Sequence, residues 1–491
     1  MASEIRVDRI THTAGVGTIT PSPTGVHIAG IVTGTTFSGS GASLTNVPDS
    51  ALSAVTSSKL TGALPALDGS ALTGVASTEN IRTNTNATFL QNVNVSGSTT
   101  TGTAVVGGGV TISESGIEAS GIGITCANIN GTQIGGRRNI VINGSMNVAQ
   151  RGTSSSDSGY ATVDRFEYRF GGTDEAPVQT QADVASGTTP YSLGFRKSYK
   201  IQNGNQTSGA GASDNIYLRQ RIEAQDIAGS GWNYTSSSSF ITLSFWVKSS
   251  VAQNFYGYVR SVDGTAQNYP FETGSLSADT WTKVTKAIPG NSNLQFDNDN
   301  DNGLNLSVIA PFWGTDYTDS GVALNTWAAY ASGTRTPDYT STWYETNNAT
   351  LEITGVQLEV GSQATAFEHR SFGEEKVLCQ RYYYLHCSGD GKTIGTGSIY
   401  TDNYVFNDIS FPVTMRANPS IDFVTGSNYY AHYSDGTADA FNQFVSLNNS
   451  NTNGCLIVSN NAGGVSNMSG GKAVHTITSN SASFLAFTAE L

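Results

Sequence analysis

Aromatic side chains with carboxylates and amides close by in the sequence are the groups best suited to recognition chemistry in this chain. Flat rings can lie against the faces of sugar rings, while amides and carboxylates can hydrogen-bond sugar hydroxyls. Residues 313–344 and 400–433 combine these types. The candidate glycan contacts are Trp313, Tyr317, Trp343, Tyr400, Asn403, Tyr404, Tyr429, Tyr430 and Tyr433. Aromatic rings are more often core residues of β-sandwiches, so packing is the alternative role for each.

A run of alternating Asp and Asn at residues 297–302 offers oxygen ligands. Asp297, Asp299 and Asp301 could bind Ca²⁺. The run departs from the EF-hand pattern because Gly303 is at its seventh position instead of the sixth and no Glu is at the twelfth. Runs of this composition are also typical of plain turns. Ca²⁺ is therefore the only cofactor that the sequence suggests, and no cofactor at all is the simpler expectation.

Motifs of common enzymes are missing from the sequence. It contains no Gly-x-Ser-x-Gly, His-Glu-x-x-His, Gly-x-Gly-x-x-Gly or P-loop pattern, and its six histidines are scattered. We therefore expect a protein without catalytic activity. A pair of carboxylates that cleaves glycosidic bonds could still assemble in space, so a glycan-degrading enzyme remains the alternative.

Strand patterns dominate the part of the chain that carries these groups. In residues 240–248, Ile241, Leu243, Phe245 and Val247 alternate with polar residues and with Trp246, which predicts one buried face. Trp246 and Trp281 are expected to be packing residues. In residues 351–360 the apolar phase flips at Gly355, which predicts a β-bulge there. Many short strands without long helices predict an all-β fold, an antiparallel β-sandwich or jelly roll.

The first 136 residues have a different composition. Only Phe37 and Phe89 of the 47 aromatic residues precede Gly136, so this part cannot bury an ordinary core. Residues 41–47 (GASLTNV) recur as residues 69–75 (GSALTGV), a short helix is expected at 49–55, and strands are expected between 93 and 134. An elongated trimeric stalk explains this pattern, because partner chains would supply the missing core; a disordered linker is the alternative.

Charge and cysteine usage exclude several classes of partner. The net charge of −13 gives no basic surface for nucleic acid or anionic lipid. No apolar stretch of 18 residues and no export signal are found, so we expect neither membrane insertion nor Sec export. The four cysteines lack zinc-site spacing, and buried thiols are expected, with a Cys387–Cys455 disulfide as the alternative.

Several segments resemble a known protein family. They are NIVINGSMNVAQRG at 139–152, DRF at 164–166, LSFWVK at 243–248, WTKV at 281–284 and TGVQLEVG at 354–361. Together they look like the jelly-roll module of tailed-phage fibres, which is related in pattern to carbohydrate-binding modules. Residues 367–383 resemble the joint to the distal domain of those fibres, and residues 3–10 (SEIRVDRI) resemble the virion-proximal part of cyanophage-like tail fibres.

This resemblance implies a homotrimeric tail fibre, or receptor-binding protein, that is made in the host cytoplasm and carried on the virion. Residues 1–31 would attach to a phage tail or baseplate protein, residues 32–136 would form the stalk, residues 137–373 the jelly roll and residues 374–491 a small β-sandwich tip. The head would mediate host recognition and adsorption by binding a surface polysaccharide or lipopolysaccharide. The alternatives are a tailspike-type enzyme and a structural connector for another tip protein.

Overall fold

A computed structural model describes residues 138–491 continuously. Before them it describes residues 9–11, 18–36, 38, 40, 45–48 and the strands between 103 and 133. The chain divides into two compact units, Met1–Thr103 and Ala104–Leu491. The second copy of the repeat, the expected helix at 49–55 and most of the first copy lie outside the described residues.

Short antiparallel strands make up the described part before residue 138. They are β1 (Ile10–Thr11), β2 (Thr18–Ser22), β3 (Gly25–Ala29), β4 (Thr103–Val106), β5 (Val110–Ser113), β6 (Gly116–Ala119), β7 (Asn128–Ile129) and β8 (Thr132–Gln133). The strands expected between 93 and 134 are therefore present at five of these places. Val26 and Ile28 of β3 are 59% and 39% exposed, so this single chain leaves apolar strand surface uncovered.

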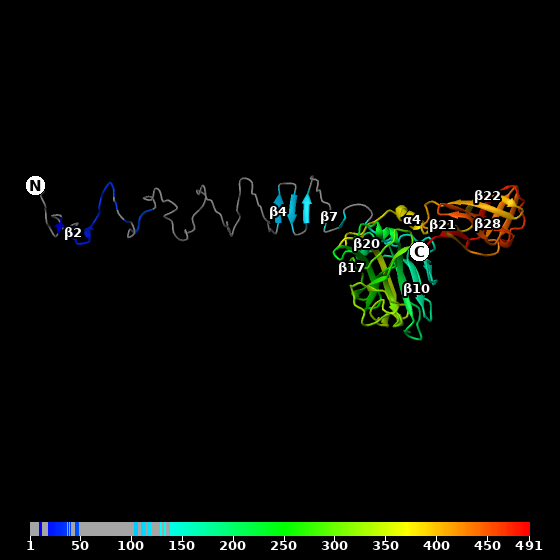
Figure 1. The fold of residues 1–491 in the computed structure, drawn as a ribbon, viewed down its shortest axis with the longest axis horizontal. Helices are drawn as coiled ribbons and strands as arrows, with labels where there is room; N and C mark the ends of the chain where they lie inside the picture. The colour runs from blue at the N-terminus through cyan, green and yellow to red at the C-terminus, as the bar shows by residue number, and fades with distance from the viewer. Residues whose placement is uncertain are drawn as a thin grey trace. The chain divides into compact units, whose positions relative to one another are not determined.

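Residues 138–371, here called the sandwich module, contain two six-stranded antiparallel sheets (Figure 1). The first, in order, comprises β10 (Glu167–Gly171), β13 (Asn215–Glu223), β18 (Asn302–Trp313), β15 (Asn254–Ser261), β16 (Gln267–Ser275) and β19 (Ala328–Ala329). The second comprises β17 (Thr282–Pro289), β14 (Phe240–Ser249), β20 (Thr350–Val360), β12 (Lys197–Gln202), β11 (Val178–Asp183) and β9 (Ser154–Ser155). Its helices are α1 (Thr189–Ser192), α2 (Ala224–Ala228) and α3 (Thr342–Glu345). The predicted all-β sandwich is confirmed.

The core of this module follows the alternation in β14. Ile241, Leu243, Phe245 and Val247 are at most 1% exposed and belong to one cluster with side chains from both sheets. The predicted bulge is confirmed, because the register between β14 and β20 shifts beside Gly355, whose φ is +65°. The bulge lets both halves of β20 keep their apolar side chains in the core.

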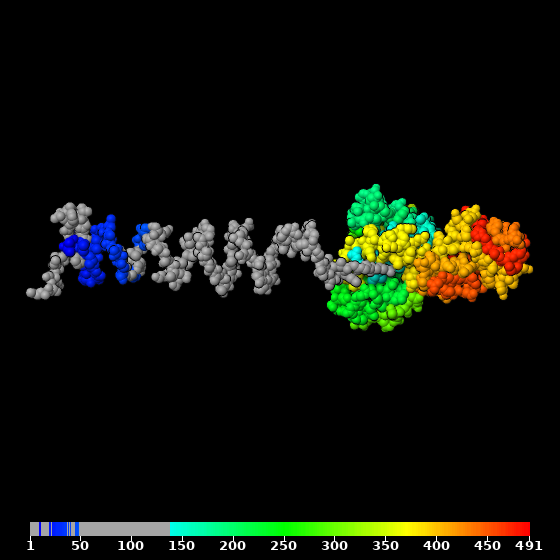
Figure 2. Space-filling view, turned by 90° about the horizontal axis from the view of Figure 1, so that it is seen from above, coloured from blue at the N-terminus to red at the C-terminus, as the bar shows by residue number. Residues whose placement is uncertain are grey.

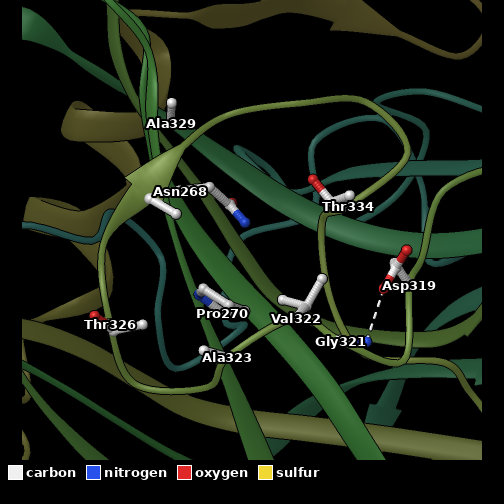
Figure 3. A pocket seen from close by; sticks show the side chains of 10 residues that line it. Asn268, Pro270, Asp319, Gly321, Val322, Ala323, Thr326, Ala329 and Thr334 are labelled. Carbon is white, nitrogen blue, oxygen red and sulfur yellow. Dashed lines mark hydrogen bonds between the residues drawn. The ribbon is translucent and has the colours of Figure 1, made fainter.

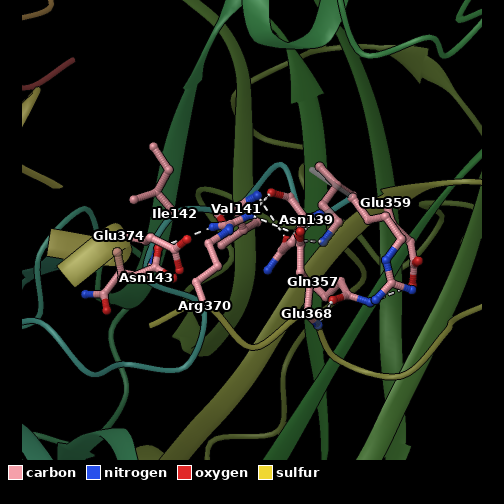
Figure 4. A network of polar contacts seen from close by, with 12 residues as sticks. Asn139, Val141, Ile142, Asn143, Gln357, Glu359, Glu368, Arg370 and Glu374 are labelled. Carbon is pink, nitrogen blue, oxygen red and sulfur yellow. Dashed lines mark hydrogen bonds and ion pairs between the residues drawn. The ribbon is translucent and has the colours of Figure 1, made fainter. Parts of the chain in front are cut away.

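A polar network ties the first described residues of the module to β20 and to the segment before α4 (Figure 4). The Asn139 side chain donates to Val356 O (3.1 Å) and accepts from Leu358 N (3.0 Å). Its backbone N–H donates to Glu368 (2.6 Å), and the Arg370 guanidinium donates to its carbonyl oxygen. Asn139 is 1% exposed, so the start of the NIVINGSMN motif closes the edge of the sandwich.

Residues 372–491, here called the C-terminal module, begin with α4 (Phe372–Gln380), whose N-terminus has a capping box of Ser371 and Glu374. A three-stranded sheet orders β21 (Tyr383–Ser388), β30 (Phe484–Thr488) and β24 (Ser420–Phe423). A seven-stranded sheet orders β26 (Thr437–Phe441), β25 (Tyr430–Ser434), β29 (Ala473–Thr478), β22 (Thr393–Thr401), β23 (Tyr404–Ser410), β28 (Gly454–Asn460) and β27 (Ser446–Asn451). Each module packs around its own cluster of buried side chains. Figure 2 shows the surface of both, the sandwich module in cyan to yellow and the C-terminal module in yellow to red.

Buried charged groups join the two modules. Arg165 is 1% exposed and forms an ion pair with Glu490, and its guanidinium lies 3.4 Å from the centre of the Tyr382 ring. Arg381 pairs with the buried Glu223 at 2.8 Å. Because unpaired buried charges are costly, these contacts hold the last residues of the chain against the sandwich module.

Cys379, Cys387 and Cys455 are free thiols, so the alternative Cys387–Cys455 disulfide is not formed. The expected burial is confirmed for Cys379 and Cys455, whereas Cys387 is half-buried; Cys126 lies outside the described residues. Burial raises the pKa of Cys387 to about 11 and that of Cys455 to about 12.

Of the helices in the described part of the chain, none is long and apolar enough to cross a membrane.

Candidate functional site

Three aromatic rings gather where β22 and β23 meet in a hairpin. The ring centre of Phe406 lies 5.6 Å from that of Tyr400 and 5.4 Å from that of Tyr404. Tyr400 is 70% exposed, the highest value among the described aromatic residues, and the other two rings are half-buried. The ring planes of Tyr400 and Tyr404 are tilted by 47° and 76° from that of Phe406, so the hairpin presents a group of angled aromatic rings to solvent.

The turn of this hairpin is held rigidly. Asn403 takes the left-handed conformation (φ +58°), which Asn tolerates better than most residues. Its side-chain oxygen accepts from Met468 N (2.7 Å), and the Asp402 carboxylate accepts from Gly470 N (2.8 Å). The Asn403 oxygen predicted for sugar hydroxyls is thus engaged in the fold. Asn460 pairs with Tyr404 across the strands, and its side-chain oxygen likewise accepts from Ala462 N (2.9 Å), which leaves its NH₂ group beside the aromatic rings.

The other tyrosines predicted for this surface lie elsewhere. Tyr430 is fully buried, and its hydroxyl donates to Val424 O and Phe484 O, so its predicted glycan contact is wrong. Tyr429 is half-buried against Gly426. Tyr433 is 45% exposed on β25, but β29 separates that strand from β22. The hairpin cluster therefore contains two of the predicted tyrosines, together with Phe406, which the sequence analysis missed.

In the sandwich module, two of the predicted aromatic residues, Trp313 and Tyr317, belong to one cluster. Trp313 is 4% exposed and stacks on Tyr217 at 4.5 Å, and the Arg335 guanidinium lies 4.8 Å from the ring centres of both Trp313 and Tyr317. Trp343 is fully buried in the core, so its predicted glycan contact is wrong. Both faces of the Trp313 ring are thus occupied by protein groups.

A shallow pocket of about 320 Å³ lies at the edge of the first sheet (Figure 3). Pro270 and Val322 form apolar parts of its wall, and Asn268, Asp319 and Thr334 contribute polar groups. The Asp319 carboxylate already accepts from Gly321 N at 2.7 Å (Figure 3). No aromatic side chain is among the lining residues, so this pocket lacks a ring for stacking.

The predicted Ca²⁺ site is not formed. Within the part of the chain that the structure describes, no three His, Cys, Asp or Glu side chains are arranged to hold a metal ion. Asp299 accepts from Asp301 N (3.0 Å), Asp301 pairs with Arg416 (3.5 Å), and Asp297 accepts from Gln295 (3.1 Å). The three carboxylates have separate partners because the run forms turns.

Groups with strongly shifted pKa values lie in the interior. Burial raises the pKa of Asp164 to about 6, although Arg151 and Gln150 favour its charged form. Burial lowers the pKa of His432 to about 4. His432 bonds Thr476 (2.9 Å) across the inner face of the seven-stranded sheet. Neither group lines the pocket of Figure 3, so these shifts reflect packing in the folded protein.

Comparisons with known proteins give only distant structural similarities. No protein-family model and no curated protein matches the chain. A tailspike protein 4 enzymatically active domain of bacteriophage CBA120 is similar with 12% identity and a TM-score of 0.24, and the match covers 45% of this chain and 21% of that one. A family 11 carbohydrate-binding module from Clostridium thermocellum has 11% identity and a TM-score of 0.19, covering 44% and 98%. A CBM22 tandem domain from Paenibacillus barcinonensis has 9% identity and a TM-score of 0.21, covering 66% and 92%. Similarity at this level identifies no function.

Proposed function

We propose that this protein is a tail fibre of a tailed phage that binds a bacterial surface glycan through the aromatic surface of the β22–β23 hairpin. The observation that carries this proposal is the exposure of Tyr400 beside Tyr404 and Phe406. Exposed rings on a rigid hairpin lose little entropy on binding, because a tyrosine has only two side-chain torsions. The sequence resemblance to phage fibres supports the same proposal.

The proposed fibre is a homotrimer attached to the phage tail or baseplate through residues 1–31. Uncovered apolar side chains in this segment support a partner there: Ile10 is 52% exposed, Val26 59% and Ile31 94%. Exposed strand edges with such side chains invite pairing with another chain. Sedimentation of the full chain should give about three times 51.5 kDa, and a stable monomer at micromolar concentration would contradict the trimer.

Binding without cleavage is the proposed mode of action. The fluorescently labelled protein should bind particular polysaccharides on an array of bacterial surface glycans and release no fragments from them. Fragment release would favour a glycan-degrading enzyme. An absence of binding to every glycan and to host cells would favour a structural connector.

Tyr400→Ala combined with Tyr404→Ala tests the location of the site. Both side chains lie on the outer surface of the hairpin, so the variant should fold normally and lose about 5- to 150-fold in glycan affinity, which corresponds to about 1–3 kcal/mol for the lost ring contacts. Tyr433→Ala is the matched control, because Tyr433 is exposed on the same sheet three strands away from β23. Equal affinities of the double variant, the control and the parent would place the site elsewhere.

A further inference from the structure

A second, more enclosed pocket lies on the outer face of the β17-β14-β20 sheet. Its volume is about 210 Å³, below the ~300–1,000 Å³ of sites for drug-sized ligands, so it suits a single ring-sized group. The residues that line it are Leu193, Phe195, Ser244, Trp246, Lys283, Gly355, Thr365, Ala366, Phe367 and His369. Aromatic and apolar side chains thus surround a few polar groups, as in many small-molecule sites.

The aromatic wall is fixed by its own packing. The Phe195 ring centre lies 4.9 Å from that of Phe367 and 5.1 Å from that of His369. His369 Nε2 lies 2.9 Å from Leu193 O, which requires a proton on Nε2 because a carbonyl oxygen only accepts. The Gly355 bulge makes room for the wall, since a Cβ there would lie 2.6 Å from the Phe195 ring.

Trp246, which is half-exposed, also lines the pocket. The residues of β14 alternate, and with Phe245 and Val247 in the core the Trp246 side chain projects onto the outer face. The alternation in the sequence already indicated this direction, although the residue was expected to be packing. Its ring, together with the Phe195 cluster, offers two apolar surfaces to a flat ligand.

Two polar groups in the pocket have no protein partner. Ser244 is 4% exposed, and no described residue hydrogen-bonds its hydroxyl. Lys283, which pairs with Trp246 across the strands, is exposed and forms no ion pair with any described carboxylate. The Ser244 hydroxyl and the Lys283 ammonium are therefore available to hydrogen-bond a ligand.

The charges around the pocket favour an anion. Arg138 donates to Thr365 Oγ1 (2.6 Å) at the rim and, like Lys283, forms no ion pair with a described carboxylate. The carboxylate of Glu359 lies behind the rim, where it accepts from Thr365 N (2.8 Å) and Gln357 (2.8 Å). Glu359 is 1% exposed and lies on the same outer face of the sheet, where Thr365 covers its carboxylate, whereas Lys283 is exposed and lines the pocket.

We infer that this pocket binds one sugar ring that carries an anionic substituent. The Trp246 and Phe195 rings would hold the apolar faces of the sugar, Ser244 would bond a hydroxyl, and Lys283 would pair with the carboxylate, sulfate or phosphate. This site belongs to the sandwich module and does not depend on the proposed hairpin site.

Titration calorimetry of the full chain tests this site with methyl β-D-glucuronide, its neutral analogue methyl β-D-glucoside, glucose 6-sulfate, glucose 6-phosphate and inorganic phosphate. We expect at least one acidic sugar to bind about five-fold or more tightly than the glucoside at low salt, with a smaller difference at high salt. The tightest acidic probe identifies the anionic group. Equal affinity for all the acidic sugars and the glucoside, or no binding of any sugar, overturns the inference. Binding of inorganic phosphate as tight as that of the sugar phosphate also overturns it, because a sugar ring would then be irrelevant.

Variants assign the binding to this pocket. Lys283→Met should bring the affinity for the acidic sugar to about the level of the glucoside, whereas Lys286→Met, on the opposite face of the same strand, should change nothing. Trp246→Ala should lower the affinity for both the acidic sugar and the glucoside at least ten-fold, and Trp246→Phe should retain most of the parent affinity. The Tyr400/Tyr404 double variant should bind as the parent does, which separates this result from the hairpin proposal. Equal effects of the two lysine variants, or full binding by Trp246→Ala, would refute the site.

Discussion

Replacing Gly355 by Ala tests whether the bulge and the rigid aromatic wall depend on each other. An added Cβ at this left-handed position costs the folded state about 1–2 kcal/mol. Alanine also lowers the conformational entropy of the unfolded chain relative to glycine, which offsets about 0.4–1 kcal/mol of this cost. The added Cβ also meets the Phe195 ring at 2.6 Å, and overpacking of this kind costs about 1–3 kcal/mol more. We expect a total loss of about 2–4 kcal/mol in the free energy of unfolding.

Gly274→Ala is the matched control for this prediction. Gly274 has a similar φ of +76°, but a Cβ there would have no atom within 4 Å, so only the backbone cost of about 1 kcal/mol remains. All six tryptophans lie between residues 232 and 343, so tryptophan fluorescence during urea unfolding reports the sandwich module alone. If both variants lost the same free energy of unfolding, the Phe195 ring would move aside freely. The wall of the pocket would then not be rigid.

Three further predictions concern buried polar groups. Because burial lowers the pKa of His432 to about 4, the unfolded chain, with a pKa near ~6.5, takes up the proton first as the pH falls. The C-terminal module should thus lose up to about 3 kcal/mol between about pH 6.5 and pH 4, and His432→Gln should reduce this slope in hydrogen exchange of β25 and β29, with a remainder from His386, whose pKa is also lowered by burial. Glu490→Ala leaves Arg165 buried without its partner and should cost about 3–5 kcal/mol, seen as faster proteolysis between the modules; unchanged cleavage would contradict this. Asn139→Ala removes bonds to two strand positions and should cost about 2–4 kcal/mol in tryptophan-monitored unfolding, whereas the exposed Asn233→Ala should cost almost nothing.

Local patterns in the sequence predicted the parts of the fold that depend on a single strand. The alternation in residues 240–248 identified the core side of β14, and the phase flip at Gly355 identified the bulge, because both follow from the two-residue period of a strand. The same pattern fails for β18, where Trp313 and its neighbours are buried on both faces. Tyr317, Arg335 and Tyr339 of the segment 314–341 pack on the outer face of that sheet. The alternation of residues within one strand does not indicate that a later segment will bury its outer face.

The candidate site was only partly predictable for a related reason. Tyr400 and Tyr430 have similar sequence surroundings, yet one is 70% exposed and the other is fully buried. The difference depends on which face of the seven-stranded sheet each residue occupies, and strands distant in the sequence determine that face. The aspartates of residues 297–301 show the same limit, because convergence of carboxylates on an ion depends on loop conformation.

A shallow aromatic surface is a weak site for a single sugar, because it buries little of the ligand and leaves much of its hydration in place. The hairpin of Tyr400 and Tyr404 has this character, with rings open to solvent and a turn held by the loop at Met468 and Gly470. In the proposed trimer, three such hairpins would meet a repetitive polysaccharide together, and linked binding of this kind can raise avidity by ~10²–10⁴ without any new contact. Weak single sites also allow a fibre to detach and rebind along a cell surface, so low affinity in the isolated head is compatible with firm adsorption by the assembled fibre.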